Sequence, residues 1–223
     1  MMRRVFAGLL LIALGAAPTL SAQQGTTLDS ALAVALRPTL EAARTDGLPE
    51  KPLLAKAREG VLKRAPRERI VGAVAALADR MRAARAELAP NATEHEVIAG
   101  AEALAVGVSG QVLRTIRVHR PRGTAAMPLE VMAHMAWRGV PPDQAADAIT
   151  RAVTGGATAA QLIALDASVR QDVESGVAPP VALQQRTRGL TFQLQSPVGR
   201  SAADAAPQSM SSSGATRARP RKP

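Results

Sequence analysis

The stretch that decides the fold is 47-GLPEKPLLAKAREGVLKRAPRERIVGAVAALADRMRAARAEL-88. Its second half repeats apolar residues at steps of three or four, the spacing of one face of an α-helix: Ile70, Val74, Leu77, Met81, Ala84 and Leu88. Its first half, from Pro52 to Lys63, has the same spacing, and Pro52 is early enough for a first helical turn, where a missing N–H costs nothing. Neither helix buries its apolar face alone. The stretch therefore predicts a helix hairpin.

Similar junctions recur along the chain. In each, a glycine adopts the left-handed conformation that ends a helix, an apolar residue packs back on the last turn, and a helix-starting residue follows. These junctions begin at Gly47, Gly107, Gly139, Gly156 and Gly176. They predict about eight helices of roughly 10 to 22 residues, and no run alternates with the period of two that a strand requires. We expect an all-α fold of tandem antiparallel helix hairpins, packed as a short irregular α-solenoid or bundle without a β-sheet.

The N-terminus has the parts of a secretory signal peptide, predicted over residues 1–22. A basic start precedes an apolar run over Val5–Ala17, and Ala22 is the small residue that signal peptidase requires. We expect a periplasmic or secreted protein with no transmembrane segment after signal removal. The rest is predicted to form an all-helical domain over 23–195 and a disordered basic tail over 196–223, rich in serine, alanine, proline and arginine.

Composition excludes several kinds of site. The chain has no cysteine, so disulfides cannot stabilise it and lipid attachment at a mature N-terminal cysteine is excluded. Trp137 and Phe192 are the aromatic residues left after signal removal, too few for the stacking platforms of carbohydrate and single-stranded nucleic-acid sites. The net charge is +10, but the cations are mostly arginine in an alanine-rich chain, a bias typical of G+C-rich genomes. Nucleic acid is therefore an unlikely partner.

Catalytic motifs are missing from the sequence. The glycine after Ser109 stands one position too early for a nucleophile elbow, and no lysine follows a glycine as a phosphate-binding loop requires. The spacing of His95, His119 and His134 does not fit a zinc-protease helix. Glu96 fits a capping box with Thr93, which gives that carboxylate a structural role. We expect a non-enzymatic protein with no catalytic residues, no cofactor and no metal site.

The segment 127-MPLEVMAHMAW-137 is the strongest candidate for a binding surface. At about 100° per residue its two sides differ. One side holds Leu129, Met132, Met135 and Ala136, and the other holds Met127, Glu130, His134 and Trp137. Met132 and Met135 are most simply core residues. Glu130 and His134 stand one turn apart and can pair.

Three interpretations of the second side remain open. Because an exposed tryptophan is a common interface anchor, Glu130, His134 and Trp137 are candidate partner-binding residues. A structural, half-buried tryptophan is the simpler alternative. A Cu(I) site of thioether and imidazole ligands is the third, but sulfur atoms on opposite sides of one helix cannot converge on one ion.

A second candidate surface consists of four arginines near the end of another predicted helix: Arg114, Arg117, Arg120 and Arg122. Cations there stabilise the negative end of the helix dipole, which explains them without a ligand. The alternative is an anion-binding surface. The cationic end of the tail has the same two interpretations: a solvated segment, or an electrostatic tether to anionic lipid, lipopolysaccharide or an acidic partner.

The function that this sequence favours is an exported, non-enzymatic helical module that holds or scaffolds another bacterial envelope protein. The second hypothesis is binding to anionic envelope surfaces through the arginines and the basic tail. The third is carriage of a metal or small molecule in the periplasm. The sequence contains no motif of a family that would decide among them.

Overall fold

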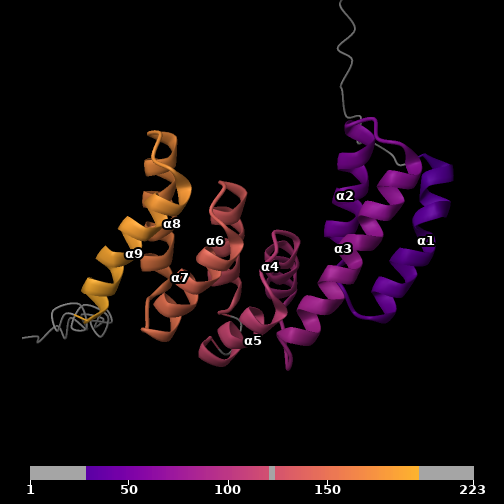
Figure 1. Cartoon of the computed structure of the whole chain (residues 1–223). Coiled ribbons are helices and arrows are strands. Elements are labelled where there is room, and N and C mark those ends of the chain that lie inside the picture. The colour runs from indigo at the N-terminus through magenta and orange to yellow at the C-terminus, as the bar shows by residue number, and fades with distance from the viewer. Residues whose placement is uncertain (1–28, 121–123, 196–223) are drawn as a thin grey trace, which may run out of the picture.

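The computed structural model describes residues 29–120 and 124–195, and all the regular secondary structure in these ranges is α-helical (Figure 1). The helices are α1 (Ser30–Thr45), α2 (Glu50–Leu62), α3 (Arg67–Glu87), α4 (Glu94–Ala105), α5 (Gly110–His119), α6 (Ala126–Trp137), α7 (Pro142–Thr154), α8 (Ala159–Glu174) and α9 (Pro179–Gln195). The predicted all-α fold is confirmed. The described ranges hold nine helices, one more than the approximate count from sequence. The predicted signal peptide and basic tail lie outside them.

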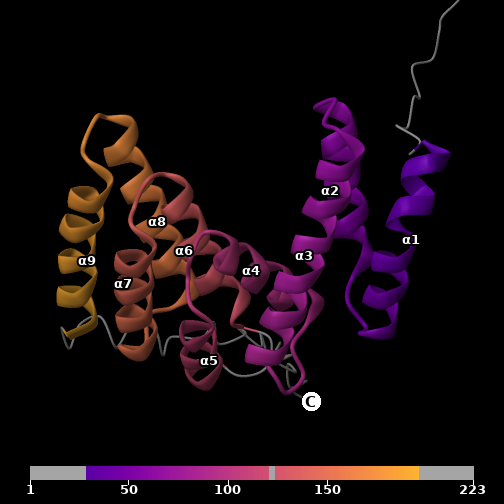
Figure 2. The same ribbon diagram turned by 45° about the vertical axis from the view of Figure 1, so that its right-hand side comes forward.

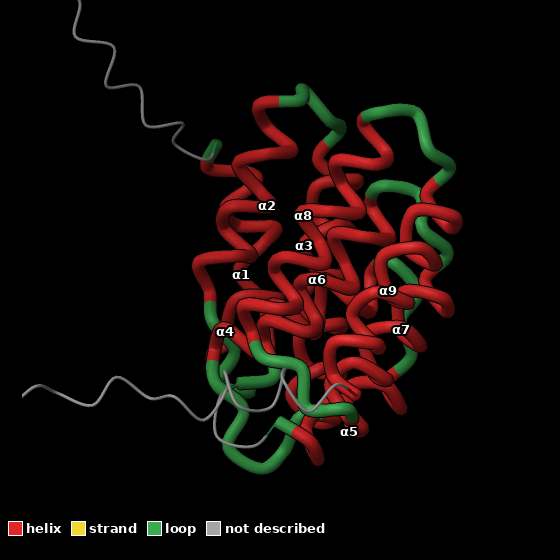
Figure 3. Tube along the Cα trace, turned by 90° about the vertical axis from the view of Figure 1, so that its left-hand side faces the viewer, coloured by secondary structure: helices red, strands yellow, loops and turns green. Residues whose placement is uncertain are grey.

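The helices follow one another in a row, with α1 and α9 at opposite ends (Figures 1 and 2). Helices two apart in the chain pack side by side: α1, α3, α5, α7 and α9 form one layer, and α4, α6 and α8 form the other. Consecutive helices belong to different layers and pack against each other across the two, as α6 does with α7 and α8 does with α9. Figure 3 looks along the row from the α9 end. This stacking is that of a short α-solenoid.

The predicted glycine junctions end their helices in the same way. Gly47, Gly107, Gly139, Gly156 and Gly176 all have positive φ, between 65° and 98°. The N–H of the residue after each glycine donates to the carbonyl five positions earlier, as in a Schellman motif; for Leu48 and Ala43 the N···O distance is 2.8 Å. Leu48 is buried, so it packs back on the helix that it follows.

The predicted hairpin stripe forms the core of the N-terminal half. Its members are fully or almost fully buried on α3, except Leu77, which is partly exposed. Small residues let α3 and α4 approach closely: a Cβ added to Gly100 would lie 2.9 Å from the Cβ of Ala84. Close packing of this kind requires small residues, and many of the buried residues between the leucine, isoleucine, valine and methionine side chains of the core are alanines.

The last helix contains a glycine and continues past it. After Gly189, α9 extends to Gln195. Leu190 is buried and Leu194 packs against the core, so tertiary contacts extend the helix past the glycine. Among the described helices, none combines the length and apolar character needed to cross a membrane.

Candidate functional site

A buried carboxylate connects three helices beside the α4 N-terminus. Glu96 is fully buried, and its Oε2 accepts hydrogen bonds from the N–H of Thr93 at 2.9 Å and from Nη2 of Arg117 at 2.9 Å. Its Oε1 accepts from the N–H of Ala125 at 3.1 Å. The Thr93 hydroxyl accepts from the Glu96 N–H, which confirms the predicted capping box. Arg117 also donates from Nε to the carbonyl of Leu88, so this group of contacts joins the end of α3 to α4, α5 and the start of α6.

The charge state of Glu96 follows from these contacts. Burial is the largest single influence and raises the pKa of Glu96, because a buried carboxylate loses hydration. The hydrogen bonds from Arg117, Thr93 and Ala125, together with the positive charge of Arg117, outweigh burial and lower the pKa below its ordinary value. Glu96 is therefore ionised at neutral pH and has a structural role.

The three predicted partner-binding residues of α6 do not form one cluster. The Glu130 carboxylate lies 2.5 Å from Nε2 of His95 on α4. His134 lies 3.9 Å from a carboxylate oxygen of Asp166 on α8, so Glu130 and His134, which can pair along the helix, each have a partner on another helix. Both side chains contact neighbouring helices instead of each other. Trp137 is 74% exposed.

The two methionines of α6 occupy the other side of the helix. Met132 and Met135 are completely buried in the core. Their sulfur atoms therefore contribute to packing, and a copper ion could reach them only if the core opened. Among the residues that the structure describes, no group of three or more histidine, aspartate or glutamate side chains is placed to hold a metal ion.

Trp137 borders a groove between α2 and α4 that encloses about 410 Å³. We call it the α2–α4 groove. α3 packs on both of these helices and forms its floor, while α2 and α4 hardly touch each other. The lining consists of Pro52, Ala55, Lys56 and Glu59 of α2, Leu77, Arg80 and Met81 of α3, Ile98, Ala101, Glu102 and Ala105 of α4, and Trp137. Most of these side chains are apolar, so the groove offers hydrophobic contact.

The charged side chains of the α2–α4 groove differ in their contacts. Lys56 is paired with Glu59 at 2.9 Å, and Lys63 also contacts Glu59. Hydrogen bonds from Lys63 and then Lys56 lower the pKa of Glu59 to about 2. Arg80 is half-buried, its Nε is inaccessible to water, and it has neither a hydrogen bond nor an ion pair within the described ranges. Glu102 on the opposite wall forms no ion pair with Arg80.

The predicted anion-binding arginines are already engaged within the protein where the structure describes them. Arg114 pairs with Glu87, and Arg117 is only 12% exposed beside Glu96. Arg120 donates to a backbone carbonyl in the α7–α8 connection. Arg122 lies outside the described residues. These contacts fix the position of α5. Arg114 is the most accessible of the three arginines, because half of its side chain is exposed.

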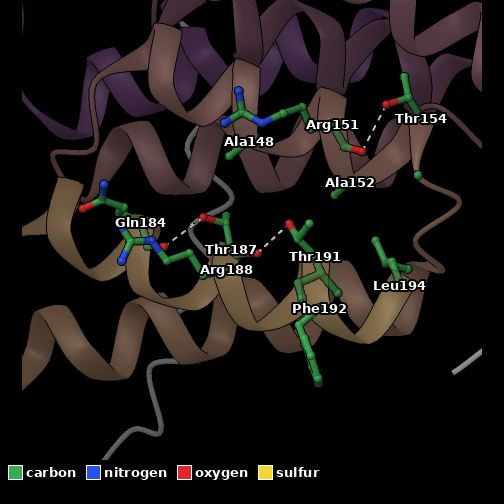
Figure 4. Close-up of a pocket in the computed structure, with 12 residues that line it drawn as sticks. Ala148, Arg151, Ala152, Thr154, Gln184, Thr187, Arg188, Thr191, Phe192 and Leu194 are labelled. Carbon is green, nitrogen blue, oxygen red and sulfur yellow. Dashed lines mark hydrogen bonds between the residues drawn. The ribbon is translucent and has the colours of Figure 1, made fainter. Parts of the chain in front are cut away.

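A second groove, between α7 and α9, encloses about 720 Å³ (Figure 4). We call it the α7–α9 groove. Arg151 of α7 and Arg188 of α9 line it. Both residues are exposed, and neither guanidinium group forms an ion pair or hydrogen bond with another described residue. The hydroxyls of Thr187 and Thr191 donate to carbonyls of their own helix. The two guanidinium groups are therefore open to an anionic ligand, beside the exposed amide of Gln184. Sequence reasoning did not single out either arginine, because the two stand on different helices and are brought together only by the packing of α7 against α9.

Comparison with known proteins does not identify a relative. No protein-family model matches the chain, and neither the curated proteins nor the solved structures that were searched include a match. Functional inference therefore depends on the geometry of these surfaces.

Proposed function

We propose that the protein is an exported, non-enzymatic helical module that holds another envelope protein in the α2–α4 groove, with Trp137 as the anchor. The observation that carries this proposal is the position of Trp137, 74% exposed, beside a groove with mostly apolar walls. Interface hot spots are enriched in tryptophan next to apolar pockets. Export rests on the sequence of residues 1–22.

The size of the possible gain supports this proposal. A tryptophan side chain offers on the order of 150–250 Å² for burial. With 74% of Trp137 exposed, covering this exposed part would contribute about 3 to 5 kcal/mol at roughly 25 cal/mol per Å², before the costs of association. One such anchor with its apolar neighbours is sufficient for a specific but reversible complex.

Site-specific photocrosslinking in cells tests this proposal. A photoreactive amino acid at Ala105 should give one defined protein adduct in the cell envelope, and the same amino acid at Ala55 on the other wall should give the same adduct. Both adducts should be lost when Trp137 is also replaced by alanine. Val118 is the matched control, because it is 75% exposed on α5 and lies outside the groove. The absence of an adduct at both groove positions, or the same adducts from position 118, would refute the proposal.

A second candidate function is binding to anionic envelope surfaces, supported by Arg151 and Arg188 of the α7–α9 groove. Two guanidinium groups without carboxylate partners attract phosphate or carboxylate groups, and this attraction weakens with salt. Replacing both with glutamine should weaken binding to anionic vesicles at low ionic strength, whereas the same change at Arg37 and Arg58 should not. Equal effects of the two double variants would indicate that net charge alone governs binding.

A further inference from the structure

We infer that the partner segment held in the α2–α4 groove is an amphipathic helix that presents an acidic side chain to Arg80. This inference rests on the proposed function and specifies the chemistry of the partner. It depends on two observations that the choice of Trp137 as anchor does not use. The groove has all-helical surroundings, and the guanidinium of Arg80 on its floor has no partner among the residues that the structure describes.

The surroundings of the groove favour a helical occupant. An extended peptide usually gains affinity by adding its backbone to an exposed sheet edge, and the described ranges contain no strand. The backbone donors and acceptors of α2, α3 and α4 are used within those helices, so a partner must bind through side chains. Within the protein, α6 already packs side by side with α4. A partner helix placed between α2 and α4 would pack on the stack in the same side-by-side way. Side chains at helical spacing would then reach Leu77 and Trp137 together.

The charge of the occupant follows from Arg80. A buried guanidinium nitrogen without an acceptor is unfavourable, and a carboxylate accepts from a guanidinium through two parallel hydrogen bonds. Lys56 cannot replace Arg80 as the cation, because Glu59 already pairs with it. Glu102 on the α4 wall disfavours an acidic residue on that side. The partner carboxylate is therefore expected over α3, at the floor of the groove.

A library of displayed helices tests the inference on the purified protein. Each 18-residue helix carries leucine at positions 4, 8, 11 and 15, and the positions flanking this stripe vary among glutamate, glutamine and lysine. Selection against the wild-type protein, with removal of helices that also bind Trp137→Ala, should enrich glutamate at one flanking position. In synthetic peptides, replacing that glutamate with glutamine should weaken binding to the wild-type protein by about tenfold to a hundredfold.

Variants of Arg80 identify the group that reads the carboxylate. Arg80→Gln should abolish the difference between the glutamate and glutamine peptides, and Arg80→Glu should reverse the selection toward lysine. Glu102→Gln is the matched control: it changes charge in the same groove and should leave the preference for glutamate intact. Melting temperatures verify that each variant is folded.

The outcomes separate the two proposals. Helices that depend on Trp137 but bind equally well with glutamate or glutamine would overturn the acidic partner and leave the groove as a docking surface. If no selected helix depends on Trp137, both the helical occupant and the use of this groove are refuted. The comparison of glutamate with glutamine peptides uses the wild-type protein, so it decides the question even if an Arg80 variant does not fold.

Discussion

Replacing Glu96 with alanine should strongly destabilise the domain. The change removes the carboxylate that pairs with Arg117 in an almost fully buried position, and it leaves the N–H groups of Thr93 and Ala125 without their acceptor. Breaking a buried ion pair by removing one partner costs about 3 to 5 kcal/mol. For a domain of this size, each kcal/mol lowers the melting temperature by roughly 2 to 4 °C, so we expect a decrease of about 6 to 20 °C.

Chemical denaturation followed by circular dichroism at pH 7 measures this effect. Glu96→Gln keeps an oxygen acceptor and loses the charge, so it should cost less, about 1 to 2 kcal/mol. Glu102→Ala is the control on the same helix, because Glu102 is exposed and should change the free energy of unfolding by less than about 0.5 kcal/mol. A double-mutant cycle with Arg117→Ala should give a coupling energy of about 1.5 to 3 kcal/mol.

The pH dependence has a defined direction. Because the folded-state pKa of Glu96 is lowered from 4.5, its stabilising contribution is complete above about pH 4.5 and is lost as the pH falls through the lowered value. The difference in stability between wild type and Glu96→Gln should therefore shrink in acid. A cost below about 1 kcal/mol for Glu96→Ala at pH 7, or no coupling to Arg117, would refute the structural role given to this carboxylate.

Three further predictions concern the glycines and Glu59. Gly100→Ala should lower the free energy of unfolding by about 1 to 3 kcal/mol, because its Cβ would lie 2.9 Å from a packed side chain. Gly72→Ala, with no atom within 4 Å of the added Cβ, should raise it by about 0.5 to 1 kcal/mol. Denaturation curves compare the two variants. Gly156→Ala should cost about 1 to 2 kcal/mol by the same measurement, because φ is +84° and the space around the residue is open, so backbone strain is the sole cause. Lys63→Gln should raise the pKa of Glu59 from about 2 toward 4.5 in an NMR titration, and an unchanged value would show that the Lys63 contact does not form in solution.

The candidate binding residues illustrate how far a helical pattern can be interpreted. The pattern of α6 correctly separates Met132 and Met135 from the side that carries Trp137. It allows Glu130 to pair with His134, but partners from α4 and α8 come within reach once the helices stack. The pattern describes one helix in isolation, and polar partners depend on its neighbours.

The sequence did not predict the contacts of the other candidates. Arg117, a predicted anion-binding residue, pairs instead with Glu96, 21 residues away, and this contact forms only when the helices stack. Arg80 belongs to a helix with several similar arginines, and its burial follows from the distance between α2 and α4. No local motif distinguishes an arginine of this kind from a solvated one.

The sequence by itself determined the helices, their ends and most of the core. These features depend on interactions within a few residues: apolar spacing, the Thr93–Glu96 cap and glycines that accept positive φ. Only the tertiary structure decided which part of an apolar stripe stays uncovered. Leu77 has the spacing of a core residue, yet it lines a groove because α2 and α4 pack on α3 without closing over it. The distance between two helices that are not consecutive in the chain depends on the whole stack, and no local pattern encodes it.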